Sequence, residues 1–164
     1  MRRISPLLAV LAAGCAHGPP GKLTLEQPSV HLIAGERVGL AYSGYRRGQH
    51  PDRGDGARPP TAAQIREDLD LVASLGVGLI RLYDAGPLSA RVLEIIAEDA
   101  RPLRVVQGAW LQGEISSHET CAWVTEPVPE ATLAAHGAEN AAELDRVIAL
   151  AKRYPGIIVA VNVG

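Results

Sequence analysis

Six aromatic or polar side chains stand where short apolar segments of the sequence end, and their types suit the binding of a sugar. They are Tyr42, Arg81, Tyr83, Asp84, Gln107 and Trp110. Aromatic rings cover the C–H faces of a sugar, while charged and amide groups bond its hydroxyls. Each residue also has a structural interpretation, in which the rings close a hydrophobic core and Arg81 forms an ion pair with Asp84 or another carboxylate. Their shared position at the ends of the apolar segments favours binding.

Carboxylates are the second group that could do chemistry, because glycosidic bonds are hydrolysed by a pair of them. The acidic candidates are Asp52, Asp55, Asp84, Glu114 and Glu119. The two aspartates at 52 and 55 lie among Pro, Arg and Gly and are interpreted as turn formers. The two glutamates lie in a long polar segment and are expected to be solvated. Asp84 is the best placed, as a partner that orients Arg81 or a sugar hydroxyl, and none of the five is assigned as a catalyst.

Composition excludes other kinds of site. The five histidines are scattered without the paired spacing of a zinc site, so neither a metal nor a cofactor is expected. A net charge of −2 offers no basic surface for nucleic acid. If Cys15 is modified, Cys121 has no partner in this sequence; it is then either buried or paired with a cysteine outside it.

Alternating apolar and amphipathic segments must position these side chains. The near-continuous apolar runs are typical of strands buried on both faces, and they are Gly39–Ser43, Leu79–Tyr83, Arg104–Trp110 and Ile157–Val163. Three helical stripes lie between them: Ile65, Leu69, Val72 and Leu75; Leu88, Val92, Ile95 and Ile96; and Leu144, Val147, Ile148 and Ala151.

Two helix starts and one helix end are visible in the sequence. Thr61 with Gln64 has the spacing of a capping box, and Gly76 is a C-terminal stop for the same helix. Asn140 with Glu143 is expected to open the third helix in the same way.

The order β-α-β-α-β-α-β predicts an α/β fold with parallel strands joined by right-handed crossovers. A doubly wound sheet needs a glycine-rich phosphate turn after its first strand. Here Gly44 and Gly48 flank bulky, charged residues, which favours a (β/α)8 TIM barrel. Because a full barrel takes about 250 residues, residues 39–164 are expected to be its first four βα units, truncated after strand 4.

Long connections are concentrated at one end of the predicted strands. Residues 44–60 and 111–138 follow the first and third strands, whereas the connections at the opposite end are short. Active sites of barrels lie at the carboxyl ends of the strands. The long connections therefore indicate substrate binding, with a tolerated surface insertion as the alternative.

The N-terminal residues have the pattern of an export signal. Residues 1–15 comprise a cationic start, a short apolar run and small residues before Cys15, which predicts a signal peptide of lipoprotein type with Cys15 lipidated. Plain secretion is the alternative. Residues 16–38 are expected to be a tether with lead-in strands at 23–25 and 30–33. The protein is then expected to be exported and anchored in a bacterial cell envelope, or else periplasmic or secreted.

Several segments resemble bacterial members of glycoside hydrolase family 17. They are residues 39–49, 64–69, 80–84, 108–111 and 158–164, of which Arg81-Leu82-Tyr83-Asp84 and Val161-Asn162-Val163-Gly164 are the most specific. The resemblance implies a retaining, two-carboxylate barrel enzyme that hydrolyses or transglycosylates β-1,3-glucan or a related β-glucan. It also implies substrate-binding roles for Tyr42, Arg81, Tyr83, Asp84 and Trp110.

The same resemblance places both catalytic glutamates outside this sequence. In the family, the fourth strand leads into an Asn-Glu pair whose glutamate is the general acid/base, and the nucleophile lies on the seventh strand. Gly164 then precedes the pair, so this chain alone is expected to be inactive. The alternative is a non-catalytic, lipid-anchored glucan-binding or cell-envelope protein. A sugar-phosphate or nucleotide enzyme is disfavoured because no phosphate loop is visible.

Overall fold

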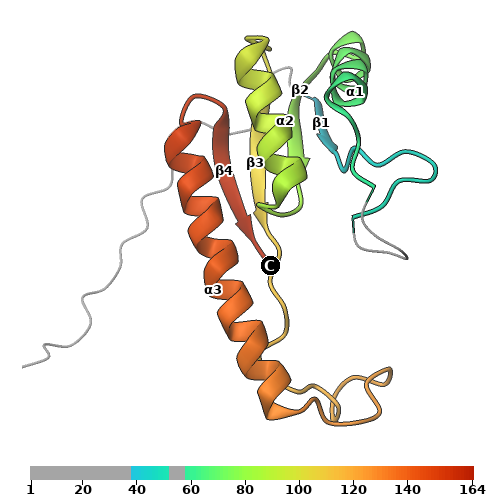
Figure 1. Cartoon of the computed structure of the whole chain (residues 1–164), viewed down its shortest axis with the longest axis vertical. Coiled ribbons are helices and arrows are strands. Elements are labelled where there is room, and N and C mark those ends of the chain that lie inside the picture. Colours follow the sequence, from blue (N-terminus) through green and yellow to red (C-terminus); the bar gives the residue numbers. More distant parts are fainter. Residues whose placement is uncertain (1–37, 52–57) are drawn as a thin grey trace, which may run out of the picture.

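The computed structural model describes residues 38–51 and 58–164, which form a parallel sheet with helices between its strands (Figure 1). The elements are β1 (Val38–Ala41), α1 (Ala62–Ser74), β2 (Val77–Leu82), α2 (Pro87–Glu98), β3 (Arg104–Ala109), α3 (Glu130–Arg153) and β4 (Ile158–Val163). The predicted α/β alternation is confirmed. The export signal with Cys15, the tether and lead-in strands, and Asp52 and Asp55 lie outside the described residues.

The strands lie in the sheet in the order in which they occur in the chain, β1-β2-β3-β4, and every neighbouring pair is parallel. A doubly wound sheet reverses its strand order at a switch point, and no such reversal occurs among the four strands of the described chain. Each crossover therefore advances the sheet by one strand in the same direction. This arrangement is compatible with consecutive βα units.

The main core lies between the sheet and its helices. Ile80 and Val105 are fully buried on the strands, where they meet Ile65 and Leu69 of α1. A row of α2 side chains packs on the same core: Val92, Leu93, Ile95 and Ile96. Because strand side chains alternate between faces, Arg81 points away from this core and is exposed, while Leu82 beside it is buried. None of the helices in the described part of the chain is both long and apolar enough to cross a membrane.

The predicted start of α1 is confirmed. Thr61 Oγ1 accepts a bond of 3.2 Å from the backbone N–H of Gln64, and Gln64 Oε1 accepts one of 2.9 Å from the N–H of Thr61. Gly76 follows the helix with φ of 71°, the left-handed conformation of a C-terminal stop. Leu75 was expected on the buried stripe but is 73% exposed. It lies at the C-cap, where the chain leaves the helical spacing.

The predicted start of α3 is wrong. The helix begins at Glu130, because residues 130–139 are rich in alanine and other strong helix formers. Asn140 and Glu143 are buried within the helix rather than capping it. The connection between β3 and α3 is correspondingly shorter than the predicted 111–138 and spans residues 110–129.

The predicted apolar stripe of α3 is only partly buried. Asn140, Glu143 and Val147 form the side of the helix that is covered, with the spacing of three and four residues that places them on one face. Leu144 and Ile148 therefore turn away from the sheet and are 37% and 50% exposed. Polar anchoring, rather than apolar packing alone, sets the rotation of this helix.

Gly108 allows β2 and β3 to approach closely at their carboxyl ends. A Cβ atom at this position would collide with the backbone oxygens of Leu82 and Tyr83. Backbone atoms cannot move aside as a flexible side chain can, so this position tolerates only glycine. The narrow separation brings the residues after β2 next to those after β3.

Replacing Gly108 with alanine is expected to destabilise the fold by about 3 kcal/mol, because the added methyl group forces the strand ends apart. Urea denaturation of the two proteins measures the difference in free energy of unfolding. Gly113→Ala is the matched control, since its nearest contact to a new Cβ is an ordinary 3.8 Å. Equal losses for the two variants would contradict the close approach.

Candidate functional site

A cleft of about 590 Å³ lies at the carboxyl ends of β1, β2 and β3. It is called the aromatic cleft here because its walls include four of the six aromatic residues of the chain, Tyr42, Tyr45, Tyr83 and Trp110. Its remaining lining residues are Ser43, Pro51, Leu82, Asp84, Leu88, Ser89, Val92 and Gln112. The structure thus brings together four of the five residues predicted to bind substrate.

Each of β1, β2 and β3 delivers a ring to this cleft from the residue directly beyond its end. Tyr42 follows β1, and its backbone N–H bonds the oxygen of Arg81 at 2.9 Å, which continues the pairing of β1 with β2. Tyr83 and Trp110 directly follow β2 and β3 and are 39% and 59% exposed. The rings are consequently held by the sheet and do not depend on the long connection for their position.

Tyr42 contributes its ring more than its hydroxyl. The side chain is buried, and the hydroxyl donates a bond of 3.1 Å to Asp68 Oδ2. Arg46 Nη2 holds the other oxygen of the same carboxylate at 2.6 Å. Burial, together with the negative charge of Asp68, raises the pKa of Tyr42 well above its usual range. The phenol therefore stays protonated, as a donor committed to Asp68.

Arg81 and Asp84 do not form the ion pair that was the structural alternative; both belong to the described residues, and each has other contacts. The Arg81 guanidinium lies over the Tyr83 ring, 5.2 Å from its centre, and Arg81 does not line the cleft. Asp84 Oδ1 accepts bonds from Gly86 N–H at 2.9 Å and Ser89 Oγ at 3.1 Å at the start of α2. Asp84 is thus fixed in orientation at the rim of the cleft.

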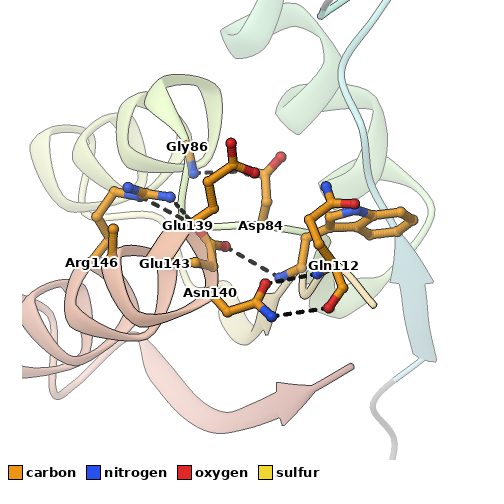
Figure 2. A pocket seen from close by; sticks show the side chains of 9 residues that line it. Asp84, Gly86, Gln112, Glu139, Asn140, Glu143 and Arg146 are labelled. Carbon is orange, nitrogen blue, oxygen red and sulfur yellow. Dashed lines mark hydrogen bonds and ion pairs between the residues drawn. The ribbon is translucent and has the colours of Figure 1, made fainter. Parts of the chain in front are cut away.

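A second, smaller cavity adjoins the aromatic cleft and is called the α3 hollow (Figure 2). Its volume is about 320 Å³, and it shares Asp84, Trp110 and Gln112 with the cleft. The other wall is α3, with residues Glu139, Asn140, Ala142, Glu143 and Arg146, and Gly86 completes the lining. The two cavities therefore lie on either side of the same strand-end residues.

The buried carboxylate of Glu143 joins three elements. Its Oε1 accepts bonds from the N–H of Ala85 at 2.7 Å and of Trp110 at 3.2 Å, just beyond the ends of β2 and β3. Its Oε2 accepts from Arg146 Nη2 at 2.7 Å and Nε at 3.1 Å, one helical turn later (Figure 2). Glu143 therefore fixes the backbone beside two residues of the aromatic cleft, Asp84 and Trp110.

Asn140 fixes the next step of the same connection. Its Oδ1 accepts from Gln112 N–H at 2.7 Å, and its Nδ2 donates to Gln112 O at 2.9 Å. The same Nδ2 donates to Glu114 Oε1 at 2.7 Å. The side-chain amide of Asn140 thus bonds both the backbone N–H and the backbone oxygen of Gln112.

Gln107 has a structural role. The side chain is fully buried and lines neither cavity; its Nε2 donates to Asp84 O at 2.5 Å and to Gly108 O at 2.8 Å. Its Oε1 is the one buried side-chain polar atom without a partner among the described residues. Gln107 thus ties the end of β3 to the end of β2 from within the sheet.

The remaining polar candidates stand outside the two cavities. Glu114 is exposed and bonds Asn140, and the Glu119 side chain is 85% exposed, 4.0 Å from His118. Cys121 is a half-buried free thiol. No group of three or more histidine, cysteine or acidic residues within 38–51 and 58–164 could hold a metal ion.

No site role was predicted for Asn140, Glu143 or Gln112. The spacing of Asn140 and Glu143 was visible, but it was interpreted as a helix cap because the preceding residues were assigned to a connection. Two buried polar residues separated by three positions in the middle of a helix are the signal that could have shown them, once the true start of α3 was known.

Removing the Glu143 carboxylate is expected to lower stability by about 3 kcal/mol, because Glu143→Ala leaves two backbone N–H groups without acceptors. Glu143→Gln is expected to lose less, since an amide oxygen still accepts from both. Chemical denaturation measures the two losses, with exposed Glu139→Ala as a control expected to stay within about 0.5 kcal/mol. A Glu143→Ala variant as stable as that control would show that the carboxylate does not hold the strand ends together.

No model of a protein family matches this chain, and neither a curated protein nor a solved structure matches it.

Proposed function

We propose that the aromatic cleft binds a β-glucan and that the chain forms part of a (β/α)8-barrel glycoside hydrolase or transglycosylase resembling family 17. The observation that carries the proposal is the gathering of four aromatic rings at the carboxyl ends of three neighbouring strands. Such rings, beside a few oriented polar groups, are what recognition of a sugar requires.

The exposure of the rings supports a binding role. Trp110 is 59% and Tyr83 39% exposed, although both directly follow buried strands. Tyr42, by contrast, is buried and offers the cleft only part of its ring. Grouped, partly exposed aromatic rings in a concave surface mark a ligand site.

The polar groups of the cleft favour a neutral ligand. Ser43, Ser89 and Gln112 can bond hydroxyls, and Asp84 is the one charged residue of the lining. A phosphorylated sugar or nucleotide would need cationic or free helix-terminal donors around the anion. The start of α2 at this cleft already carries the Asp84 carboxylate, which accepts from Gly86 N–H and Ser89 Oγ and would repel an anion. A neutral glucan meets only the carboxylate, which can accept bonds from its hydroxyl groups.

The strand order supports the barrel. A sheet that advances in one direction is what a closed barrel requires, and the cleft lies at the end of the strands where barrels bind their substrates. The retaining mechanism implied by the resemblance needs two carboxylates about 5–5.5 Å apart. The resemblance assigns both to positions outside this sequence, so the chain alone is proposed to bind glucan without cleaving it.

Binding of laminarin, a β-1,3-glucan, by the 164-residue chain tests the cleft. Isothermal titration is expected to show binding that Trp110→Ala weakens about tenfold, the effect of losing one central aromatic contact. Tyr83→Ala is expected to act in the same direction. Leu75→Ala is the control, because Leu75 is exposed and does not line the cleft. Unchanged affinity in both aromatic variants, or no binding by the parent chain, would sink the proposal.

Turnover is a separate measurement. Incubation of the pure chain with laminarin, followed by an assay for new reducing ends, is expected to give no product. Release of oligosaccharides that scales with protein concentration would show that the assignment of both catalytic carboxylates is wrong, while leaving the binding cleft in place.

A further inference from the structure

Residues 111–139, here called the arm, extend from the carboxyl end of the sheet. The arm consists of the connection after Trp110 and the first part of α3, and Figure 1 shows it reaching beyond the ends of β3 and β4. The helix rises by about 15 Å between Glu130 and Asn140, at 1.5 Å per residue. The arm therefore lies at the same end of the sheet as the aromatic cleft.

Hydrogen bonds give the arm a definite conformation. Val128 N–H donates to Ser116 Oγ at 3.0 Å, and Cys121 N–H donates to Ser117 O at 2.8 Å. His136 Nδ1 lies 2.7 Å from Gly113 O, which ties the connection to the helix. At its base the arm is held by the bonds of Asn140 to Gln112. The side chains of the connection are thus presented from an ordered backbone.

The arm carries the two most exposed large apolar side chains of the described residues. Trp123 is 89% exposed and Ile115 is 80% exposed. Leaving an indole in water forgoes a large gain from burial, and tryptophan is enriched where surfaces bind other molecules. Neither residue lines the aromatic cleft, so they indicate a separate contact surface.

The charge of the arm selects among possible partners. It carries Glu114, Glu119, Glu126, Glu130 and Glu139, and it has no lysine or arginine. Nucleic acid and anionic lipid headgroups attract basic surfaces, and this one would repel them. A neutral polymer with C–H faces for the indole and hydroxyl groups for the carboxylates meets no such repulsion.

We propose that Trp123 forms an outer binding site for the same neutral glucan chain that occupies the aromatic cleft, so that the protein selects long chains over short oligosaccharides. The inference rests on the proposed function, because the first site on the chain is the cleft. Two contacts on one polymer raise its affinity beyond that of either contact alone. A disaccharide can occupy one site only and gains nothing from the arm.

The two tryptophans allow the arm to be observed by itself. Trp110→Phe keeps an aromatic ring in the cleft and leaves Trp123 as the sole tryptophan of the chain. Laminarin is expected to shift the fluorescence of Trp123 to shorter wavelength and to protect it from acrylamide quenching. Laminaribiose is expected to change neither. An unaltered Trp123 signal at laminarin concentrations that saturate this variant would overturn the inference.

Affinity measurements are the second part of the test. Trp123→Ala is expected to weaken laminarin binding about tenfold and to leave laminaribiose binding unchanged, whereas Trp110→Ala weakens both. Thr125→Ala, two residues away on the same exposed connection, is the matched control. Circular dichroism and the unfolding midpoint establish that each variant is folded.

The possible failures are distinguishable. If Trp110→Ala weakens laminarin binding and Trp123→Ala does not, the outer site is wrong and the cleft stands. If laminarin binding by the parent chain is absent, both proposals fail together. Sedimentation with phosphatidylcholine and phosphatidylglycerol vesicles tests a lipid surface: binding that Trp123→Ala abolishes, without an effect on laminarin, would assign the arm to membranes and overturn the inference.

Discussion

One buried carboxylate determines how the ends of this sheet are arranged. Glu143 accepts the first free backbone N–H after the end of β3 and another just beyond β2, while its second oxygen is held by Arg146. A buried backbone N–H left without an acceptor here would cost more free energy than a typical hydrogen bond contributes. The carboxylate thus selects a single rotation of α3, and that rotation explains why Leu144 and Ile148 face outward. The wall of the α3 hollow and the direction of the arm both follow from it.

The arrangement separates rigidity from recognition. Gly108 and Gln107 hold the ends of β2 and β3 together from within the sheet, and α3 holds them from outside. Tyr83 and Trp110 directly follow β2 and β3, so the backbone that carries their rings is held in place by the strands. The polar rim belongs to the start of α2 and to Gln112, which Asn140 fixes. Rings and polar groups are therefore presented by different elements that share one set of anchors.

The sequence predicted the parts of the structure that depend on local patterns. Four apolar runs became the four strands, and the Thr61–Gln64 capping box formed with both of its bonds. The position of residues after strand ends was enough to gather Tyr42, Tyr83, Asp84 and Trp110. Arg81 was expected to join them, but its guanidinium lies over the Tyr83 ring and Arg81 does not line the cleft. The functions of these residues, and the family that they resemble, stay predictions.

What escaped the sequence depends on contacts between distant residues. Asn140 and Glu143 have the spacing of a cap, and nothing local shows that their partners are backbone groups 28 to 58 residues away. The alanine-rich segment before them has no apolar stripe to mark it as helix, because much of the arm is exposed. Tertiary hydrogen bonds, rather than periodicity, decide which part of α3 packs against the sheet.

The arm is also part of the longest link between paired strands in the described structure, the one that runs from β3 to β4. The entropy of closing such a link grows only with the logarithm of its length, so doubling the connection adds about 0.6 kcal/mol. The anchors at Glu143 and Asn140 lie at the base of the arm and do not depend on its far end. Evolution can therefore lengthen, shorten or exchange the tip while the sheet keeps its stability, which makes the reach of this protein adjustable separately from its fold.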